Sequence, residues 1–241
     1  SETITTSPGM ISVNTVAART ADEVGRGNVA ATARRLGIAS PVNTDPAMAL
    51  GTTLVSPLEM TQAYAAFSNG GARVAAYGIE RIRTNGGQLI YQRKAQPQAR
   101  VIANPALSDM NRMLRSVVAS GTGGRAKIAG YDLAGKTGTT SDYKDAWFAG
   151  YSGGFTTVVW MGRDDAAPMQ RITGGGAPAE LWRGFMSVAL KRVPAQAISA
   201  GPAAPLVAPP PVEILAAPAE QGAAPQPEPA VETPEDPPIG N

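Results

Sequence analysis

Apolar residues recur at helical spacing in several segments of the chain. The spacing predicts helices over about 14–24, 28–36, 56–68, 104–119 and 178–191. The start near position 56 is the clearest, because Ser56 can cap the helix, Pro57 suits its first turn and Glu59 can reach back to the cap. The chain therefore has a substantial helical part.

Strand-like segments form two groups. Residues 78–84 and 88–94 flank Asn85-Gly86-Gly87, which is typical of a hairpin turn. Three further strands are expected at about 133–140, 146–152 and 156–163, and their short links predict antiparallel neighbours. Helices, then strands, then a closing helix predict an α+β fold in which the helical part packs on an antiparallel sheet.

The composition changes at Pro194. Residues 194–241 hold 13 of the 21 prolines and six acidic residues, with no Lys or Arg. Such a segment buries too little apolar surface to offset the entropy of ordering, so we expect a disordered Pro/Ala/Glu-rich tail. Residues 1–193 then carry 21 basic and 13 acidic residues, but the arginines are spread along the chain, which argues against nucleic-acid binding.

Two residue types are missing, and this restricts the chemistry. The chain has no Cys and no His, which excludes thiolate catalysis, a Ser-His-Asp triad and histidine metal ligands. A hydrolase or transferase here must use Lys or a carboxylate as its base. We expect no metal and no cofactor. We also expect no membrane contact by this chain, because it has no long apolar run and no targeting segment.

The candidate chemistry lies in Gly135-Lys136-Thr137-Gly138-Thr139-Thr140. The motif places a cation, hydroxyl groups and bare glycine backbone together. That combination can hold a carboxylate and an oxyanion at one spot.

K-T-G is one of three linked signatures of penicillin-binding proteins and serine β-lactamases, and a second, S-x-N, stands at Ser12-Val13-Asn14. The chain resembles class A penicillin-binding proteins, the bifunctional peptidoglycan glycosyltransferase/transpeptidases, in the C-terminal half of their transpeptidase domain. The segments that carry the likeness are 12–17, 49–60, 67–71, 135–148 and 160–165. They make 11–193 a partial penicillin-binding domain, whereas 1–10 is an unrelated or disordered start.

The resemblance implies a β-lactamase/transpeptidase-like fold and a serine-type D-Ala-D-Ala transpeptidase that cross-links peptidoglycan. The expected partners are peptidoglycan stem peptides and β-lactam antibiotics, which mimic the D-Ala-D-Ala end. The parent protein would be membrane-anchored on the periplasmic side of the bacterial inner membrane.

The resemblance also assigns roles to single residues. Catalytic roles fall on Ser12, Lys136 and Thr139, and substrate binding on Asn14, Thr137, Gly138 and Thr139. Ser12 would pass a proton to the leaving nitrogen, and Lys136 would face the substrate carboxylate. The backbone N–H of Thr139 would form half of an oxyanion hole.

The third signature, S-x-x-K, carries the attacking serine, and the sequence has no suitable match to it. Its one match, Ser141 to Lys144, is expected to link two strands, whereas the chemistry needs the serine at a helix start. We therefore expect an N-terminally truncated fragment without its nucleophile, inactive alone and with exposed apolar surface. The alternative is a non-catalytic remnant or stem-peptide binding module.

A more distant alternative is a P-loop NTPase, because 130–137 match G-x-x-x-x-G-K-[ST]. That motif needs a helix after it, and strand-like sequence follows instead.

Some residues also have a purely structural interpretation. Ser12-Val13-Asn14 would equally suit a helix N-cap, and Asp164-Asp165 a solvated strand end. The aromatic side chains expected in the core are Trp147, Phe148, Trp160 and Trp182.

Overall fold

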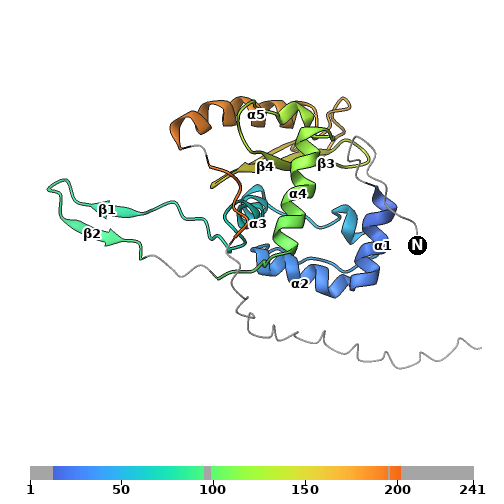
Figure 1. Ribbon diagram of the computed structural model, residues 1–241, viewed down its shortest axis with the longest axis horizontal. Coiled ribbons are helices and arrows are strands. Elements are labelled where there is room, and N and C mark those ends of the chain that lie inside the picture. The colour runs from blue at the N-terminus through green and yellow to red at the C-terminus, as the bar shows by residue number, and fades with distance from the viewer. Residues whose placement is uncertain (1–12, 95–98, 195, 202–241) are drawn as a thin grey trace, which may run out of the picture. The chain divides into compact units, whose positions relative to one another are not determined.

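Three antiparallel strands form the central sheet, in the order β3-β4-β5 (Figure 1). Their bounds are Ala134–Thr139 for β3, Asp145–Ser152 for β4 and Phe155–Gly162 for β5. The computed structural model describes residues 13–94, 99–194 and 196–201. The expected antiparallel order is confirmed, and β3 is an edge strand.

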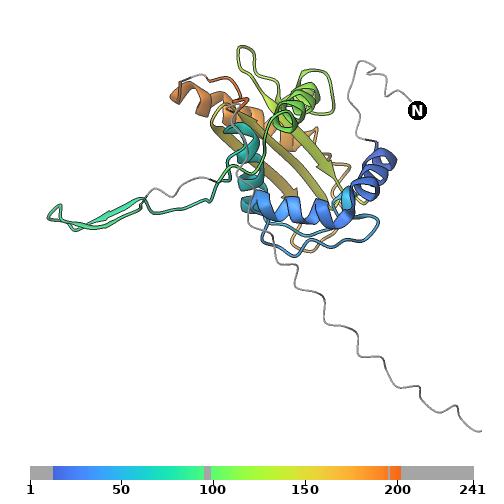
Figure 2. The same cartoon turned by 60° about the horizontal axis from the view of Figure 1, so that its bottom comes forward.

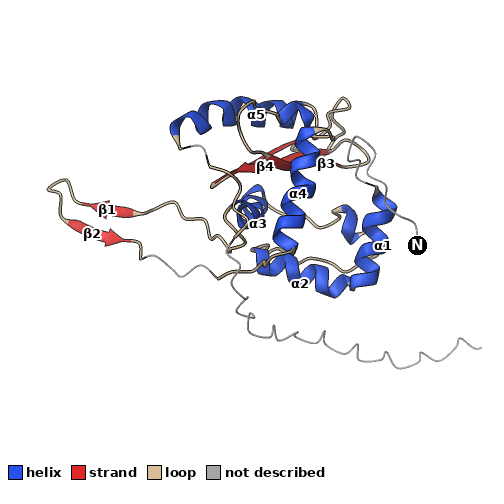
Figure 3. Cartoon of the chain, in the orientation of Figure 1, coloured by secondary structure: helices blue, strands red, loops and turns tan. Residues whose placement is uncertain are grey.

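Helices lie on both sides of this sheet, as Figure 3 shows. They are α1 (Asn14–Val24), α2 (Arg26–Leu36), α3 (Pro57–Ser68), α4 (Ala106–Ala119) and α5 (Ala177–Ala189), with short 3-10 turns η1 (Met48–Leu50), η2 (Gly124–Ala126) and η3 (Leu190–Arg192). The start predicted for the second helix is wrong. Asn28 lies inside α2, where its side-chain amide donates to the carbonyl of Val24 at 2.8 Å.

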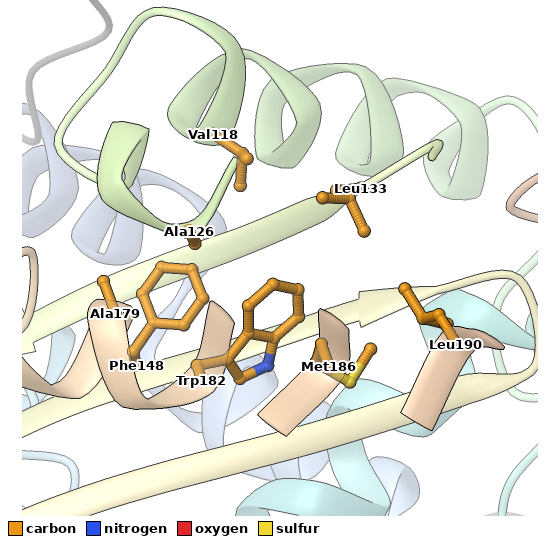
Figure 4. Packing of buried hydrophobic residues seen from close by; sticks show 8 residues of the cluster. All are labelled: Val118, Ala126, Leu133, Phe148, Ala179, Trp182, Met186 and Leu190. Carbon is orange, nitrogen blue, oxygen red and sulfur yellow. The ribbon is translucent and has the colours of Figure 1, made fainter. Parts of the chain in front are cut away.

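One face of the sheet packs against α5 and the other against α3 (Figures 1 and 2). On the α5 side, Phe148 and Trp182 meet edge to face, with ring centroids 5.3 Å apart. The indole N–H of Trp182 donates to the carbonyl of Thr157 at 3.0 Å. Figure 4 shows this cluster, whose buried members are Val118, Ala126, Leu133, Phe148, Ala179, Trp182, Met186 and Leu190.

The second cluster lies on the α3 side of the sheet. Tyr151 is fully buried there, and its hydroxyl donates to Oδ1 of Asn111 at 2.6 Å. The amide of Asn111 in turn donates to the carbonyl of Phe67 at 3.3 Å, which links α4 to α3. Buried polar groups are stable only when paired, so this chain of bonds fixes the helices on the sheet.

The first turn of α3 is capped by the residues that the sequence predicts. Ser56 and Glu59 form a reciprocal capping box. The Glu59 carboxylate also accepts hydrogen bonds from the backbone N–H groups of Ala39, at 2.8 Å, and Ser40, at 2.7 Å. Glu59 therefore ties the loop after α2 to the first turn of α3.

A second carboxylate anchors the end of the described chain. Asp132 accepts two bonds of 2.7 Å from the Arg115 guanidinium, and it accepts the backbone N–H of Ile198 at 2.9 Å. Ile198 is buried against Leu114, Ala134 and Tyr151. The packed part of the chain therefore reaches Gly201, beyond the change in composition at Pro194.

The short strands β1 (Arg81–Arg83) and β2 (Leu89–Gln92) pair only with each other. They are shorter than predicted, and every residue in both is exposed. We call residues 77–94 the arm; Figure 1 shows it extending away from the helices.

Some apolar residues of the helices are not buried. Leu181 and Phe185 of α5 are more than half exposed, because the buried face of this helix is formed by Pro178, Ala179, Trp182 and Met186. Met113 of α4 is likewise 42% exposed.

Candidate active site

The K-T-G motif lies on β3, the edge strand of the sheet. Successive side chains of a strand point to opposite faces. Lys136 and Gly138 pair across the sheet with Ala149 and Trp147, and all four line one pocket. The strand therefore presents its cation to the α3 side of the sheet.

The pocket has a volume of about 470 Å³. Its walls come from the K-T-G strand, the aromatic ends of β4 and β5, the loop after η1 and the first turns of α3. Most of the lining side chains are apolar: Leu50, Leu54, Val55, Pro57, Met60, Tyr64, Ala149, Trp147 and Trp160. The site is thus a cation set in a largely apolar hollow.

Lys136 is the cation of this hollow, which Asp145 also lines. It is half-buried, and its ammonium donates to the carbonyl of Thr137 at 2.9 Å. Burial lowers the pKa of Lys136 below its ordinary value, because the apolar surroundings disfavour the charged form. It makes no ion pair with any carboxylate of the described residues. Its charge is therefore free for an anion that enters the pocket.

The backbone of β3 offers donors at its open edge. The N–H of Thr140 bonds the carbonyl of Asp145 at 3.0 Å, so that residue faces β4. In an antiparallel ladder the inward and outward residues alternate. The N–H of Thr139, one position earlier, consequently points away from β4 to the free edge.

The threonine side chains of the motif have partners on the other side of the strand. The hydroxyls of Thr137 and Thr122 lie 2.7 Å apart, and the Thr139 hydroxyl accepts the N–H of Gly174 at 3.0 Å. A Cβ on Gly174 would lie 2.2 Å from the carbonyl oxygen of Trp147. A Cβ on Gly175 would lie 2.3 Å from the carbonyl oxygen of Thr122. Only glycine lets the loop before α5 support the strand this closely.

The structure tests only one of the two predicted site residues near the N-terminus. Ser12 lies outside the described residues. Asn14 is the exposed first residue of α1, and it is absent from the described residues that line the pocket. The N-cap of α1 is Val13, which makes no side-chain capping bond, so the capping interpretation has no support among the described residues.

Sequence reasoning missed several residues of the site. Thr122, Gly174 and Gly175 support the strand, and Leu50 and Leu54 line the hollow. The signal for the glycines was the run Gly174-Gly175-Gly176, which is hard to place in a helix or a strand.

The expectation that Trp147 and Trp160 are core residues is wrong. Both line the pocket, with ring centroids 6.1 Å apart, and Trp160 is 41% exposed. Its indole N–H donates to Oδ1 of Asp145 at 2.9 Å. Phe148 and Trp182 are buried, as expected.

The structure bears on two rejected motifs. Residues 141–144 form the turn between β3 and β4, so Ser141 is not at a helix start. Residues 130–137 lead into β3, and no helix follows to bind phosphate.

The acidic pair after β5 has a simple explanation. Asp165 is exposed and accepts two bonds, of 2.8 and 2.7 Å, from the Arg163 guanidinium.

Within the described ranges, no three His, Cys, Asp or Glu side chains are grouped to hold a metal. No helix in those ranges has the length and apolar character needed to cross a membrane.

A K-T-G strand at the edge of an antiparallel sheet, between helical layers, is characteristic of the penicillin-reactive serine enzymes. The family model described as "Penicillin binding protein transpeptidase domain" matches residues 9–180. The chain therefore belongs to the family of penicillin-binding protein transpeptidase domains.

Individual relatives agree with this. Penicillin-binding protein 1A of Neisseria meningitidis is 37% identical over 75% of this chain, and that of Aquifex aeolicus 33% over 76%. The chain spans about a quarter of the length of these relatives, 23% and 25% respectively.

The fold matches solved structures as well. The crystal structure of penicillin-binding protein 1A from Haemophilus influenzae covers 78% of this chain, at 25% identity and a TM-score of 0.70, and the match spans 34% of that chain. The PonA1 protein of Mycobacterium tuberculosis, solved with penicillin V, covers 80% of this chain with a TM-score of 0.67, and the match spans 59% of that chain. The predicted transpeptidase-like α+β fold is confirmed.

Proposed function

We propose that this chain carries the substrate-binding half of a serine D-Ala-D-Ala transpeptidase that cross-links peptidoglycan. The observation that carries the proposal is the half-buried Lys136, unpaired with any described carboxylate, beside the outward N–H of Thr139. A cation and an oxyanion donor on one bare strand suit a peptide that ends in a carboxylate.

The substrate would lie along the edge of β3 as an added strand. Its C-terminal carboxylate would be bound by the charge of Lys136 and by the hydroxyls of Thr137 and Thr139. Gly138 leaves room for the peptide backbone to approach. Asn14, by family resemblance, would bind the acyl-side amide.

The reaction would be acyl transfer without a metal or histidine. A serine oxygen attacks the carbonyl of the penultimate D-Ala; a C–O ester bond forms and the peptide C–N bond breaks. The Thr139 N–H stabilises the oxyanion, and one such donor is worth about 2.7–4 kcal/mol. The proton of the attacking serine hydroxyl passes through Ser12 to the nitrogen of the D-Ala that leaves. An amine of a second stem peptide then displaces the ester and returns a proton to the serine oxygen.

The attacking serine would come from an element outside these 241 residues, since their one S-x-x-K match forms a turn. The apolar hollow beside Lys136 suits such an element. Leu54 is 90% exposed at its rim, and Leu50 is 48% exposed. An amphipathic helix laid there would bury these side chains and bring a serine to the K-T-G strand.

With these roles the chain would act on the periplasmic side of the inner membrane. It would bind stem peptides and the β-lactams that mimic them. A second candidate is a stem-peptide binding module without catalysis. It is favoured by the same lack of a suitable S-x-x-K in the sequence.

Two measurements on the 241-residue chain separate these functions. The first is calorimetric titration with diacetyl-Lys-D-Ala-D-Ala, for which we expect binding that Lys136→Met weakens about tenfold to a hundredfold, the cost of losing a charged hydrogen-bond partner. Lys127→Met, at an exposed lysine, is the matched control. No binding, or equal loss in both variants, contradicts the proposed site.

The second measurement is labelling with a fluorescent penicillin, read by denaturing gel and intact mass. We expect no adduct on this chain and an adduct on a longer form that includes an upstream S-x-x-K. An adduct on Ser141 would contradict the rejection of that residue as the nucleophile. A longer form that binds the peptide but never acylates would favour the binding module.

A further inference from the structure

The arm has an open edge. Its two strands pair only with each other among the described elements, and residues 75–92 are exposed throughout. A two-stranded hairpin is marginally stable in water unless a further strand or a helix supports it. The arm therefore has the properties of a surface that a partner completes.

The tip of the arm is nevertheless well ordered by hydrogen bonds. The N–H of Thr84 donates to the carbonyl of Gln88 at 2.9 Å, and Arg83 donates to the carbonyl of Gly87 at 2.8 Å. Near the base, Arg93 lies over the ring of Tyr77, 3.6 Å from its centroid. A partner would meet strands that are already formed, so it would not have to order them.

The two edges of the arm differ. Pairing runs from Ile82–Tyr91 to Arg83–Leu89, so Ile90 is bulged out of β2. Bulges hinder the addition of another strand. The edge of β1 has no such irregularity and is the accessible one.

The backbone N–H and C=O groups that point away from β2 belong to the two arginines of β1. The carbonyl of Glu80 accepts from Arg93 and the N–H of Thr84 donates to Gln88, so positions 80 and 84 face β2. By the alternation of an antiparallel ladder, the N–H and C=O groups of Arg81 and Arg83 face outward. Their side chains project from one face, two residues apart.

Charge selects among the possible partners. The arm carries four cations, Arg81, Arg83, Arg93 and Lys94, against the single acid Glu80. A second copy would bring like charges together at the edge, which is unfavourable. A strand with carboxylates at alternate positions would place them beside both arginines.

We infer that the edge of β1 is a docking site for an extended acidic segment of another protein, which adds as a third strand. Backbone hydrogen bonds to Arg81 and Arg83 hold the segment, and carboxylates at alternate positions pair with their guanidinium groups. This interaction does not depend on the K-T-G pocket or on the proposed acyl transfer.

The test titrates the full chain with a short synthetic peptide that alternates glutamate and valine. We expect binding with slowed amide hydrogen exchange at Arg81 and Arg83, and at least about tenfold weaker affinity in the Arg81→Glu/Arg83→Glu variant. Lys191→Glu/Arg192→Glu is the matched control, since it makes the same charge change at exposed residues of η3. The control should bind within about twofold of the original chain.

The same peptide with its central valine replaced by proline distinguishes strand addition from simple charge attraction, because proline removes a ladder N–H. Equal binding of both peptides overturns the inference. Binding of phosphatidylglycerol vesicles through Arg81 and Arg83, with no binding of the peptide, also overturns it and identifies a membrane surface instead. Failure of the alternating peptide to bind at all overturns it as well.

Discussion

Glu59 accepts hydrogen bonds from two separate loops, and this makes it sensitive to pH. The N–H donors of Ser56 and Ser40 lower the pKa of its carboxyl from 4.5 to about 2. A lowered carboxyl pKa contributes stability above the unfolded value, and that contribution is lost as pH falls through the folded value. The charge of Glu59 therefore stabilises the fold above about pH 4.5 and ceases to do so near pH 2.

We predict that Glu59→Gln lowers the free energy of unfolding at neutral pH, and that the difference from the original chain shrinks between about pH 4.5 and 2. Urea unfolding along that pH range measures it. Glu180→Gln is the control, since Glu180 is exposed and paired only with Arg125. A difference that does not change with pH would show that the charge is not responsible.

The charge of Lys136, unlike that of Glu59, lowers the stability of the fold. Its pKa is lowered by burial, so the folded state disfavours its charge, and stability should rise with pH between the folded and unfolded pKa values. We predict that Lys136→Met gives an equal or higher Tm while it weakens binding of the D-Ala-D-Ala peptide. A lower Tm, measured by circular dichroism, would mean that the bond to Thr137 matters more than the desolvation of the ammonium.

The candidate site shows what single residues can tell before a structure exists. Lys136 and Gly138 line the pocket, because K-T-G is a local motif whose spacing matches one strand. Trp147 and Trp160 were assigned to the core, because their apolar character cannot distinguish a buried face from a pocket wall. Only the pairing register of β3, β4 and β5 decides that.

Among the elements, β4 is the most constrained, because it packs on both faces. A Cβ at Gly150 would lie 2.8 Å from ring atoms of both Phe148 and Trp182. We predict that Gly150→Ala costs about 1–3 kcal/mol of unfolding free energy, the usual cost of overpacking.

Gly184→Ala is its matched control. Gly184 lies in α5, and nothing stands within 4 Å of the Cβ that alanine would add. Alanine favours helix over glycine by about 0.8–1.0 kcal/mol, so this variant should be more stable. If both variants lose stability alike in denaturant titrations, the packing of Gly150 is not the cause.

The elements themselves followed from the sequence where local signals were strong. The capping residues Ser56, Pro57 and Glu59 gave the start of α3, and short links gave the order of β3, β4 and β5. Local signals failed where distant contacts decide. Leu181 and Phe185 are apolar residues of α5, yet both are more than half exposed, and the ring of Phe155, 6.4 Å from that of Phe185 between centroids, covers Phe185 only in part.

The ends of the hairpin strands were also misjudged. Ile79, inside the predicted strand 78–84, has strand propensity, but it has no partner in the ladder. Propensity alone therefore overestimates the length of an unsupported hairpin.

At the scale of the whole molecule, the arm and the sheet should respond differently to a protease. Arg81, Arg83 and Lys94 are exposed on a hairpin with little tertiary support, whereas the sheet is covered by α3 and α5. We predict that brief trypsin treatment cleaves in the arm first, because low local stability exposes backbone to cleavage.

The nicked protein should retain its far-ultraviolet circular dichroism and its Tm. Mass spectrometry of the first fragments identifies the cut. First cleavage within β3 or β4 would mean that the sheet, and not the arm, is the weakest part. That result would agree with the expectation that the truncated chain exposes apolar surface.

The Asp132 carboxylate, which binds both Arg115 and Ile198, also determines how the molecule would bear mechanical load. A force applied at Gly201 meets first the hydrogen bond from Asn104 to the carbonyl of Ala200, then the bridge between Ser199 and Asn69, and then the bond from Ile198 to Asp132. Asp132 stands two residues before β3, so the pull reaches the K-T-G strand directly. Tension on the C-terminal side of this domain would therefore strain its binding edge before it unfolds the rest.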